Sequence, residues 1–153
     1  MKSILVTGGA GFIGSHTCLS LLERGYVIFI MDSFVNASEE SIKRISAILN
    51  KNGLYTKEKI YSINGDIKNL SDIEKVFQMS IELDKRIESV IHFAGLKSVF
   101  DSVINPYEYW DTNVVGTINL LKIMQKYDVK NIVFSSSATV YKVKENGKLN
   151  END

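Results

Sequence analysis

The chain has few of the features that stabilise secreted proteins or mark membrane segments. It has one cysteine, Cys18, among its 153 residues, so an internal disulfide is excluded. Its 18 basic residues balance its 18 acidic residues, and this zero net charge does not favour nucleic acid or an anionic membrane as a partner. No apolar run approaches the roughly 20 residues of a membrane-spanning helix, and Met1–Val6 has no signal-sequence features. We therefore expect a cytoplasmic protein with neither a nucleic-acid nor a membrane partner.

Proline and metal-ligand clusters are equally scarce. The only proline, Pro106, precedes a run of apolar residues spaced at three and four, which suits the first turn of a helix. No group of His, Cys, Asp and Glu has metal-ligand spacing, so we expect no metal site. Cys18 lies in an apolar helical run, and we interpret it as a packing residue.

Strand-like and helix-like segments alternate along the chain, which predicts an α/β fold with a doubly wound parallel sheet. We predict a dinucleotide-binding domain over 1–141, a polar tail over 142–153, and no substrate domain. Ser71-x-x-Glu74 predicts a capping box at the start of the third helix. The expected strands are Ser3–Thr7, Val27–Met31, Lys59–Ile63, Ser89–Phe93 and Asn131–Ser136, and the expected helices are Phe12–Glu23, Glu39–Asn50, Asp72–Leu83 and Pro106–Tyr127.

A glycine-rich turn joins the first expected strand to the first helix. Gly8, Gly11 and Gly14 fit a variant of G-x-G-x-x-G with one more residue in the first gap, and Gly9 with the latter two fits the standard spacing. Such glycines allow a tight turn, close approach of backbone N–H groups to a pyrophosphate, and close helix packing. Asp32 ends the next strand, where an acid binds the adenosine ribose hydroxyls. These features in order predict a nucleotide site.

Three further groups follow expected strands. Asp66 fits either an adenine amino acceptor or an ordinary turn residue. Lys97, after His92-Phe93-Ala94-Gly95-Leu96, fits either a ribose donor or a solvated loop lysine, and His92 itself is interpreted as a core residue. The hydroxyl run Ser135–Ser137 fits either a sugar site or a helix cap.

Taken together, these motifs resemble the extended short-chain dehydrogenase/reductase family and, within it, the UDP-glucose 4-epimerase family. The resemblance rests on Val6–Cys18, on His92–Val99, on Asn113-Val114-Val115-Gly116-Thr117 and on Ser135–Tyr141. It implies a Rossmann-like sheet, truncated here after the fifth strand, and a bound NAD. It also implies a UDP-hexose substrate epimerised at C4 through a keto-sugar, and a homodimer for the complete enzyme.

The resemblance also implies a role for individual residues. Ser137 would bond the reacting sugar hydroxyl. Cofactor contacts would come from four groups, which are Gly8, Gly11, Phe12, Ile13 and Gly14 at the pyrophosphate; Asp32, Ser33, Phe34, Val35, Asn36 and Ala37 at the adenosine ribose; Asp66 and Ile67 at adenine; and Phe93, Ala94, Gly95, Leu96, Lys97, Thr112 and Asn113 at the nicotinamide half.

The chain departs from the family at the catalytic base. The family uses the tyrosine of a Tyr-x-x-x-Lys motif about 25 residues after the serine, which places it near position 162. In the one such motif here, Tyr55 to Lys59, the tyrosine precedes the third strand, away from the strand end that carries Ser137, and we reject it as the base. Three interpretations follow, namely an incomplete epimerase, a stand-alone NAD-binding module, or one half of a split enzyme.

Overall fold

Five parallel strands form one sheet in the part of the chain that the structure describes. The computed structural model describes residues 2–54, 57–137 and 140–141. The strand order is β3-β2-β1-β4-β5, so the predicted parallel α/β architecture is confirmed. The strands are β1 (Ser3–Thr7), β2 (Val27–Asp32), β3 (Ile60–Asn64), β4 (Ile87–His92) and β5 (Asn131–Phe134).

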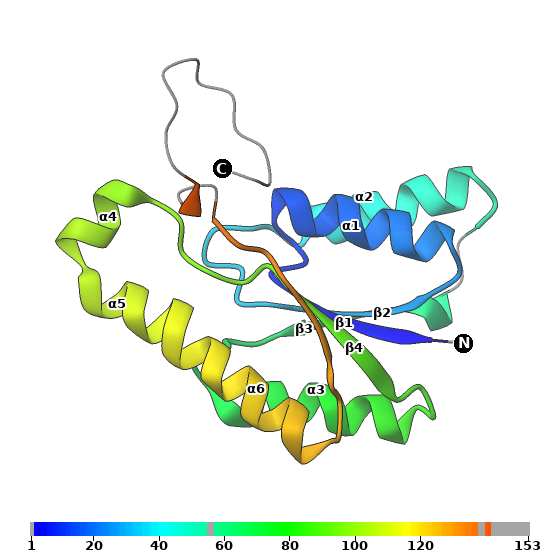
Figure 1. The fold of residues 1–153 in the computed structure, drawn as a ribbon. Helices are drawn as coiled ribbons and strands as arrows, with labels where there is room; N and C mark the ends of the chain where they lie inside the picture. Colours follow the sequence, from blue (N-terminus) through cyan, green and yellow to red (C-terminus); the bar gives the residue numbers. More distant parts are fainter. Residues whose placement is uncertain (1, 55–56, 138–139, 142–153) are drawn as a thin grey trace.

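Helices cover both faces of the sheet. From β1 the chain moves outward to β3 and then returns to place β4 on the other side of β1. Because parallel crossovers are right-handed, this reversal moves the following helices to the opposite face. Figure 1 shows α1 (Phe12–Glu23) and α2 (Glu40–Lys51) above the sheet, and α3 (Leu70–Glu82) and α6 (Gly116–Lys126) below it.

The predicted helix over 106–127 is divided into three segments. It consists of α5 (Pro106–Trp110), a π-helical segment η2 (Asp111–Val115), and α6. A separate short helix, α4 (Val99–Ile104), was not predicted, and a 3-10 turn, η1 (Lys57–Lys59), precedes β3. The spacing of apolar residues did not predict η2, because a single π-helical turn hardly changes the pattern in which apolar residues recur every three or four positions.

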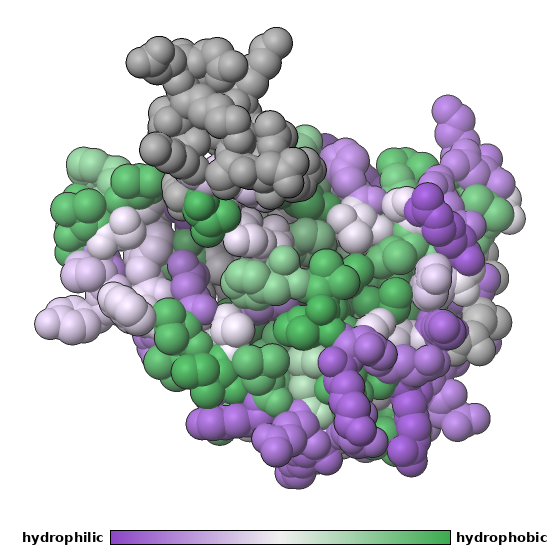
Figure 2. Space-filling view, in the orientation of Figure 1, coloured by the Kyte–Doolittle hydropathy of each residue, from purple (hydrophilic) through white to green (hydrophobic). Residues whose placement is uncertain are grey.

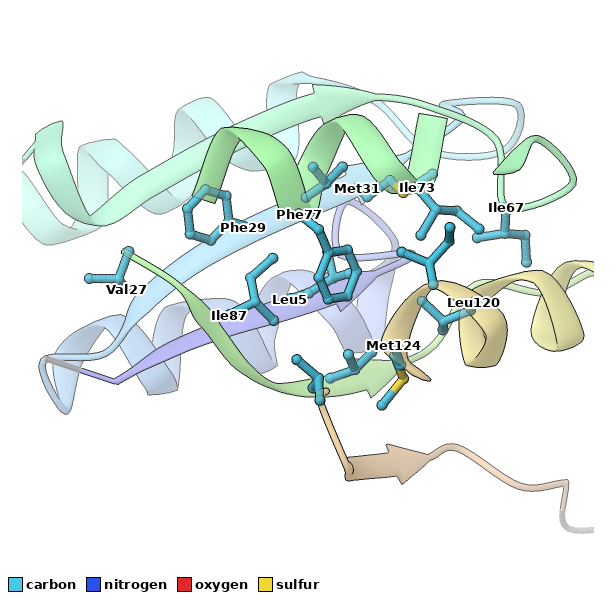
Figure 3. Packing of buried hydrophobic residues seen from close by; sticks show 14 residues of the cluster. Leu5, Val27, Phe29, Met31, Ile67, Ile73, Phe77, Ile87, Leu120 and Met124 are labelled. Carbon is cyan, nitrogen blue, oxygen red and sulfur yellow. The ribbon is translucent and has the colours of Figure 1, made fainter. Parts of the chain in front are cut away.

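The hydrophobic core has one part on each face of the sheet. Between the sheet and α3 and α6, Phe77 packs against the central strands, as Figure 3 shows, with Leu120 beside it. On the other face, Cys18 and Leu22 of α1 pack on alternate residues of β1 and β2. Strands buried on both faces explain the continuous apolar runs of β1 and β2.

The start of α3 corrects the predicted capping box. Asn69, not Ser71, is the N-cap, and its side-chain oxygen accepts a hydrogen bond from the Ser71 N–H at 3.1 Å. The helix therefore begins two residues earlier than predicted. Asn and Ser are both good caps, so the sequence pattern alone did not distinguish between them.

We predict that Asn69→Ala lowers the free energy of unfolding by about 1 kcal/mol, because the first-turn N–H groups lose their side-chain acceptor. Asn69→Asp, which retains an acceptor oxygen, is the matched control and should stay close to the unchanged chain. Urea unfolding followed by circular dichroism measures both variants. A loss of stability in Ser71→Glu but none in Asn69→Ala would instead show that Ser71 is the N-cap, as the capping-box pattern predicts.

Candidate functional site

The carboxyl ends of all five strands meet at one edge of the sheet. Backbone hydrogen bonds continue the ladder into each loop, from Gly65 N–H to Asp32 O at 3.0 Å and from Gly8 N–H to Met31 O at 2.8 Å. Ser135 N–H likewise donates to the His92 carbonyl at 3.1 Å. The loops after β3, β2, β1, β4 and β5 therefore start side by side in that order. This edge brings together the predicted groups of cofactor and sugar residues.

The glycine turn depends on two close approaches. Gly8 has a φ of +67°, and a Cβ there would lie 2.6 Å from the Ala94 nitrogen. A Cβ on Gly14 would lie 2.3 Å from the Gly8 carbonyl oxygen. A side chain at Gly14 would therefore push the first turn of α1 away from the loop after β1. A side chain at Gly8 would push that loop away from the loop after β4.

The first turn of α1 has the features of an anion-binding helix terminus. The N-cap is Gly11, with no side-chain cap and no acidic residue in the first turn. Phe12 and Ile13 are exposed, and as the first helical residues their backbone N–H groups have no partner in the preceding turn of the helix. The helix dipole and these N–H groups together favour negative charge.

The Asp32 carboxylate connects the ends of two strands. It is buried at the end of β2, where one oxygen accepts the Ala10 N–H at 2.9 Å and the other accepts the Phe34 N–H at 3.0 Å. Phe34 has a φ of +55°, so the loop turns sharply after Asp32. The remainder of that loop contains the exposed residues Ser33, Val35 and Asn36 and the half-buried Ala37.

The loop after β3 is held by α6. Ile67 is buried, and a Cβ on Gly116 would lie 2.7 Å from its side chain. The Asn119 amide donates to the Lys68 carbonyl at 2.9 Å. Asp66 is half-buried, and its carboxylate accepts the Lys68 N–H at 2.9 Å.

An ion pair ties the same loop to α5. The Lys68 ammonium lies 2.6 Å from a carboxylate oxygen of Glu108 and 3.6 Å from one of Asp66. The bond to Glu108 raises the pKa of Lys68, and the bond to Lys68 lowers the pKa of Glu108. Both groups therefore remain charged, and the loop carries a fixed pattern of opposite charges.

The loop after β4 is clamped by the π-helical segment. Asn113 in η2 accepts the Leu96 N–H at 2.8 Å and donates to the Leu96 carbonyl at 2.9 Å. Thr112 is buried beside it, while Gly95 and Lys97 are exposed. Phe93 and Ala94 are half-buried where the loop leaves the strand.

His92 lies beneath this loop, with 1% of its surface exposed. Its Nδ1 lies 2.5 Å from the Thr7 hydroxyl, and its Nε2 lies 3.0 Å from the Thr117 hydroxyl. Burial lowers its pKa to about 4, so the ring is neutral near pH 7. The interpretation of His92 as a core residue therefore agrees with its burial.

Ser137 follows β5 at the same edge, and its side chain is exposed. Its carbonyl accepts the Val140 N–H at 3.2 Å. Ala138 and Thr139 of the hydroxyl-rich motif, Tyr55, and the predicted tail over 142–153 lie outside the described residues.

The sequence motifs assigned no role in the site to Gly116, Asn119, Lys68 or Glu108. A glycine within a helical run and an asparagine on its buried side are signals that could have indicated a close contact with another segment. The Lys68–Glu108 pair has no local signal, because its partners are 40 residues apart.

Two further classes of site have no counterpart in the described part of the chain. No three His, Cys, Asp or Glu side chains there are grouped so that they could hold a metal ion. None of the helices found in those residues has the length and apolar character needed to span a membrane.

Comparisons with known proteins find matches along almost the whole chain. The family model described as GDP-mannose 4,6 dehydratase matches residues 5–153. UDP-glucose 4-epimerase 3 of Oryza sativa subsp. japonica is 49% identical over 139 residues, which are 91% of this chain and 35% of that protein.

Two solved structures are similar to the fold. The UDP-glucose 4-epimerase of Bifidobacterium longum, in complex with NAD+ and UDP, matches with a TM-score of 0.81 and 39% identity over 98% of this chain and 41% of its own. That of Stenotrophomonas maltophila, with NAD and formylated UDP-arabinopyranose, matches with a TM-score of 0.81 and 38% identity over 95% of this chain and 40% of its own. The chain thus spans about two-fifths of the length of these relatives.

We predict that His92 makes the fold less stable in acid. An unfolded histidine has a pKa of about 6.5, and the folded pKa is about 4, so the unfolded chain takes up the proton first as the pH falls. The free energy of unfolding therefore drops below pH ~6.5, by about 2 kcal/mol at pH ~5, and His92 contributes no further loss below pH ~4.

Urea unfolding at pH 7 and pH 5 measures this loss. His92→Phe should show a smaller difference between the two pH values than the unchanged chain. His16→Asn, at the exposed histidine on α1, is the matched control and should keep the full difference. An equal pH dependence in His92→Phe and the unchanged chain would contradict the prediction.

Proposed function

The chain belongs to the family described as GDP-mannose 4,6 dehydratase, and we propose that it is the NAD-binding part of a UDP-glucose 4-epimerase. The observation that carries this proposal is the order of the loops along the sheet edge. The predicted adenine, ribose, pyrophosphate and nicotinamide residues follow β3, β2, β1 and β4, which are neighbours in that order. The groups of a dinucleotide are joined in the same order.

The described residues fit the chemistry of NAD. The uncapped first turn of α1, after Gly11, offers N–H donors to a pyrophosphate. The Asp32 carboxylate can accept from ribose hydroxyls while it still accepts from Ala10 N–H and Phe34 N–H, because each oxygen has two lone pairs. Asp66 is half-buried at the expected adenine position. Lys97 is exposed and offers donors to the second ribose.

The hexose would bind beside the loop that follows β4. Bound NAD supplies hydride transfer to and from C4 of the hexose. Ser137, beyond β5, would donate a hydrogen bond to the 4-hydroxyl and orient it. Within these 153 residues no tyrosine other than Tyr55 has a lysine four positions later. Lys59 immediately precedes β3, so it lies at the amino end of that strand. The candidate site lies at the carboxyl ends of the strands.

A second copy of the complete enzyme is the partner we propose for α4–α6. Apolar side chains spaced at three and four along α5, η2 and α6 are exposed, led by Tyr107 at 87% and Trp110 at 66%. We call them the outer stripe, which consists of Tyr107, Trp110, Val114, Ile118 and Leu121. Such spacing is typical of helix-to-helix contact between subunits.

The uncovered surface continues beyond these helices. Val133 and Phe134 of β5 are exposed, and hydrophobic residues dominate the centre of the face in Figure 2. In a complete enzyme we expect further chain to cover this edge.

The cysteine content and the proposed reaction suggest where the protein acts. The buried thiol of Cys18 and the absence of a second cysteine in these residues support a reducing, cytoplasmic compartment. Epimerisation of a UDP-hexose at C4 is a reaction of galactose metabolism.

We predict that the chain binds NAD at least about tenfold more tightly than NADP, because Asp32 repels a 2′-phosphate. Calorimetric titration with each dinucleotide measures the ratio. Asp32→Asn keeps the size of the side chain and one acceptor oxygen but removes the charge, so it should narrow the ratio. Equal or tighter binding of NADP to the unchanged chain would refute the proposed ribose site.

We predict that the 153-residue chain with added NAD does not interconvert UDP-galactose and UDP-glucose. A general base contributes roughly 10²–10⁴-fold to such a reaction, and the uridine-binding contacts that position C4 would also come from outside these residues. A coupled assay for UDP-glucose, with Ser137→Ala as the background control, measures turnover. Turnover above that control would show that these residues contain a base of their own.

We predict that the purified chain self-associates through the outer stripe. Light scattering should give a mass above that of one chain, and Trp110→Glu should lower it because a charge cannot be buried there without cost. Leu54→Glu, which changes an exposed apolar residue far from the stripe in the sequence, is the matched control. A monomer in the unchanged chain would contradict the proposed contact.

A further inference from the structure

His92 is a buried polar side chain to which the proposed function assigns no role. An imidazole in a protein interior is costly unless both ring nitrogens find partners. Both do so here, with Thr7 at the end of β1 and Thr117 on α6. An apolar side chain at this position would leave both threonine hydroxyls without these bonds. The histidine therefore links three elements that meet under the candidate site.

The hydrogen bonds around the ring assign its tautomer. The Thr117 hydroxyl donates to the Asn113 carbonyl at 2.7 Å, so its one proton is already used. It must then accept from His92, which places the ring proton on Nε2. Nδ1 is left as an acceptor, and the Thr7 hydroxyl donates to it.

These bonds continue to the loop after β4. Thr117 binds the backbone carbonyl of Asn113. The side chain of the same Asn113 binds both the N–H and the carbonyl of Leu96. Asn113 lies in η2, the π-helical segment, where the regular backbone ladder is interrupted. A Cβ on Gly95 would lie 3.1 Å from the Asn113 side-chain oxygen, so the loop passes close to this amide.

We propose that His92 is a positioning residue for the nicotinamide half of the dinucleotide site. Through its Nε2–H it holds Thr117, Thr117 holds the backbone of Asn113, and Asn113 holds Leu96. Thr7 fixes the other side of the ring to β1, one residue before Gly8. The proposal rests on the proposed NAD site and assigns no direct contact with the cofactor to His92.

The test compares NAD with ADP, which lacks the nicotinamide riboside. In His92→Phe we expect NAD affinity to fall about tenfold, the size of effect expected when a buried hydrogen-bond network is lost, while ADP affinity changes less than about twofold. Thr117→Val should reproduce this pattern. His92→Gln, whose amide can donate to Thr117, should restore part of the NAD affinity.

Two further readouts separate positioning from a general loss of stability. Amide hydrogen exchange at Leu96, measured without any ligand, should speed up in His92→Phe and in Thr117→Val. Ser46→Ala removes a comparable hydroxyl bond to the Ile42 carbonyl on α2 and should leave the Leu96 exchange rate unchanged. Nitrogen-15 NMR of the imidazole should find the proton on Nε2.

The outcomes are distinct for the two proposals. If the unchanged chain binds neither NAD nor ADP, the proposed NAD site is wrong and the role of His92 in it falls as well. If the unchanged chain binds NAD, equal losses of NAD and ADP affinity, or a Leu96 exchange rate unaffected by His92→Phe, overturn the positioning role alone. Additive effects of His92→Phe and Thr117→Val on NAD affinity would also overturn it, because residues in one network are coupled.

Discussion

The arrangement of the site depends on the close contact between the glycine turn and the start of the β4 loop. With a Cβ on Gly8 only 2.6 Å from the Ala94 nitrogen, the two backbones touch where β1 and β4 end. A Cβ on Gly14 would lie still closer to the Gly8 carbonyl oxygen, so α1 also packs tightly against Gly8. The uncapped first turn of α1 is thereby held over the middle of the sheet edge. This is the topological switch point, where doubly wound sheets bind their ligands.

Buried polar contacts, in addition to close packing, determine the geometry of the loops at this edge. Asp32 receives N–H groups from the glycine turn and from its own loop, and His92 joins β1 to α6. Each of these groups is costly to bury and has its partners in place. Loss of one partner would leave another group unsatisfied, so the network favours a single geometry of the loops.

The helical run α5–η2–α6 has different functions on its two sides. Its inner side holds the loops, through Asn113 at Leu96 and through Gly116 and Asn119 at the segment after β3. Its outer side exposes the apolar stripe that we propose to contact a second copy. The same helical run therefore contacts the loops at both the adenine and the nicotinamide ends of the proposed site, and the side that we propose to face a second copy makes none of these contacts.

The sequence by itself determined the five strands, the helices α1, α2 and α3 to within about two residues, and the loops that meet at the sheet edge. It did so because burial on both faces, helical spacing and glycine turns are local signals. Tertiary structure decided the rest. The Asn69 cap, α4 and η2 depend on which of several acceptable local conformations packs best. The contacts of Asn119 with Lys68 and of His92 with Thr117 join residues 51 and 25 positions apart. No local pattern encodes such pairs, because a side chain acquires its partner only when the crossover helices fold back onto the sheet.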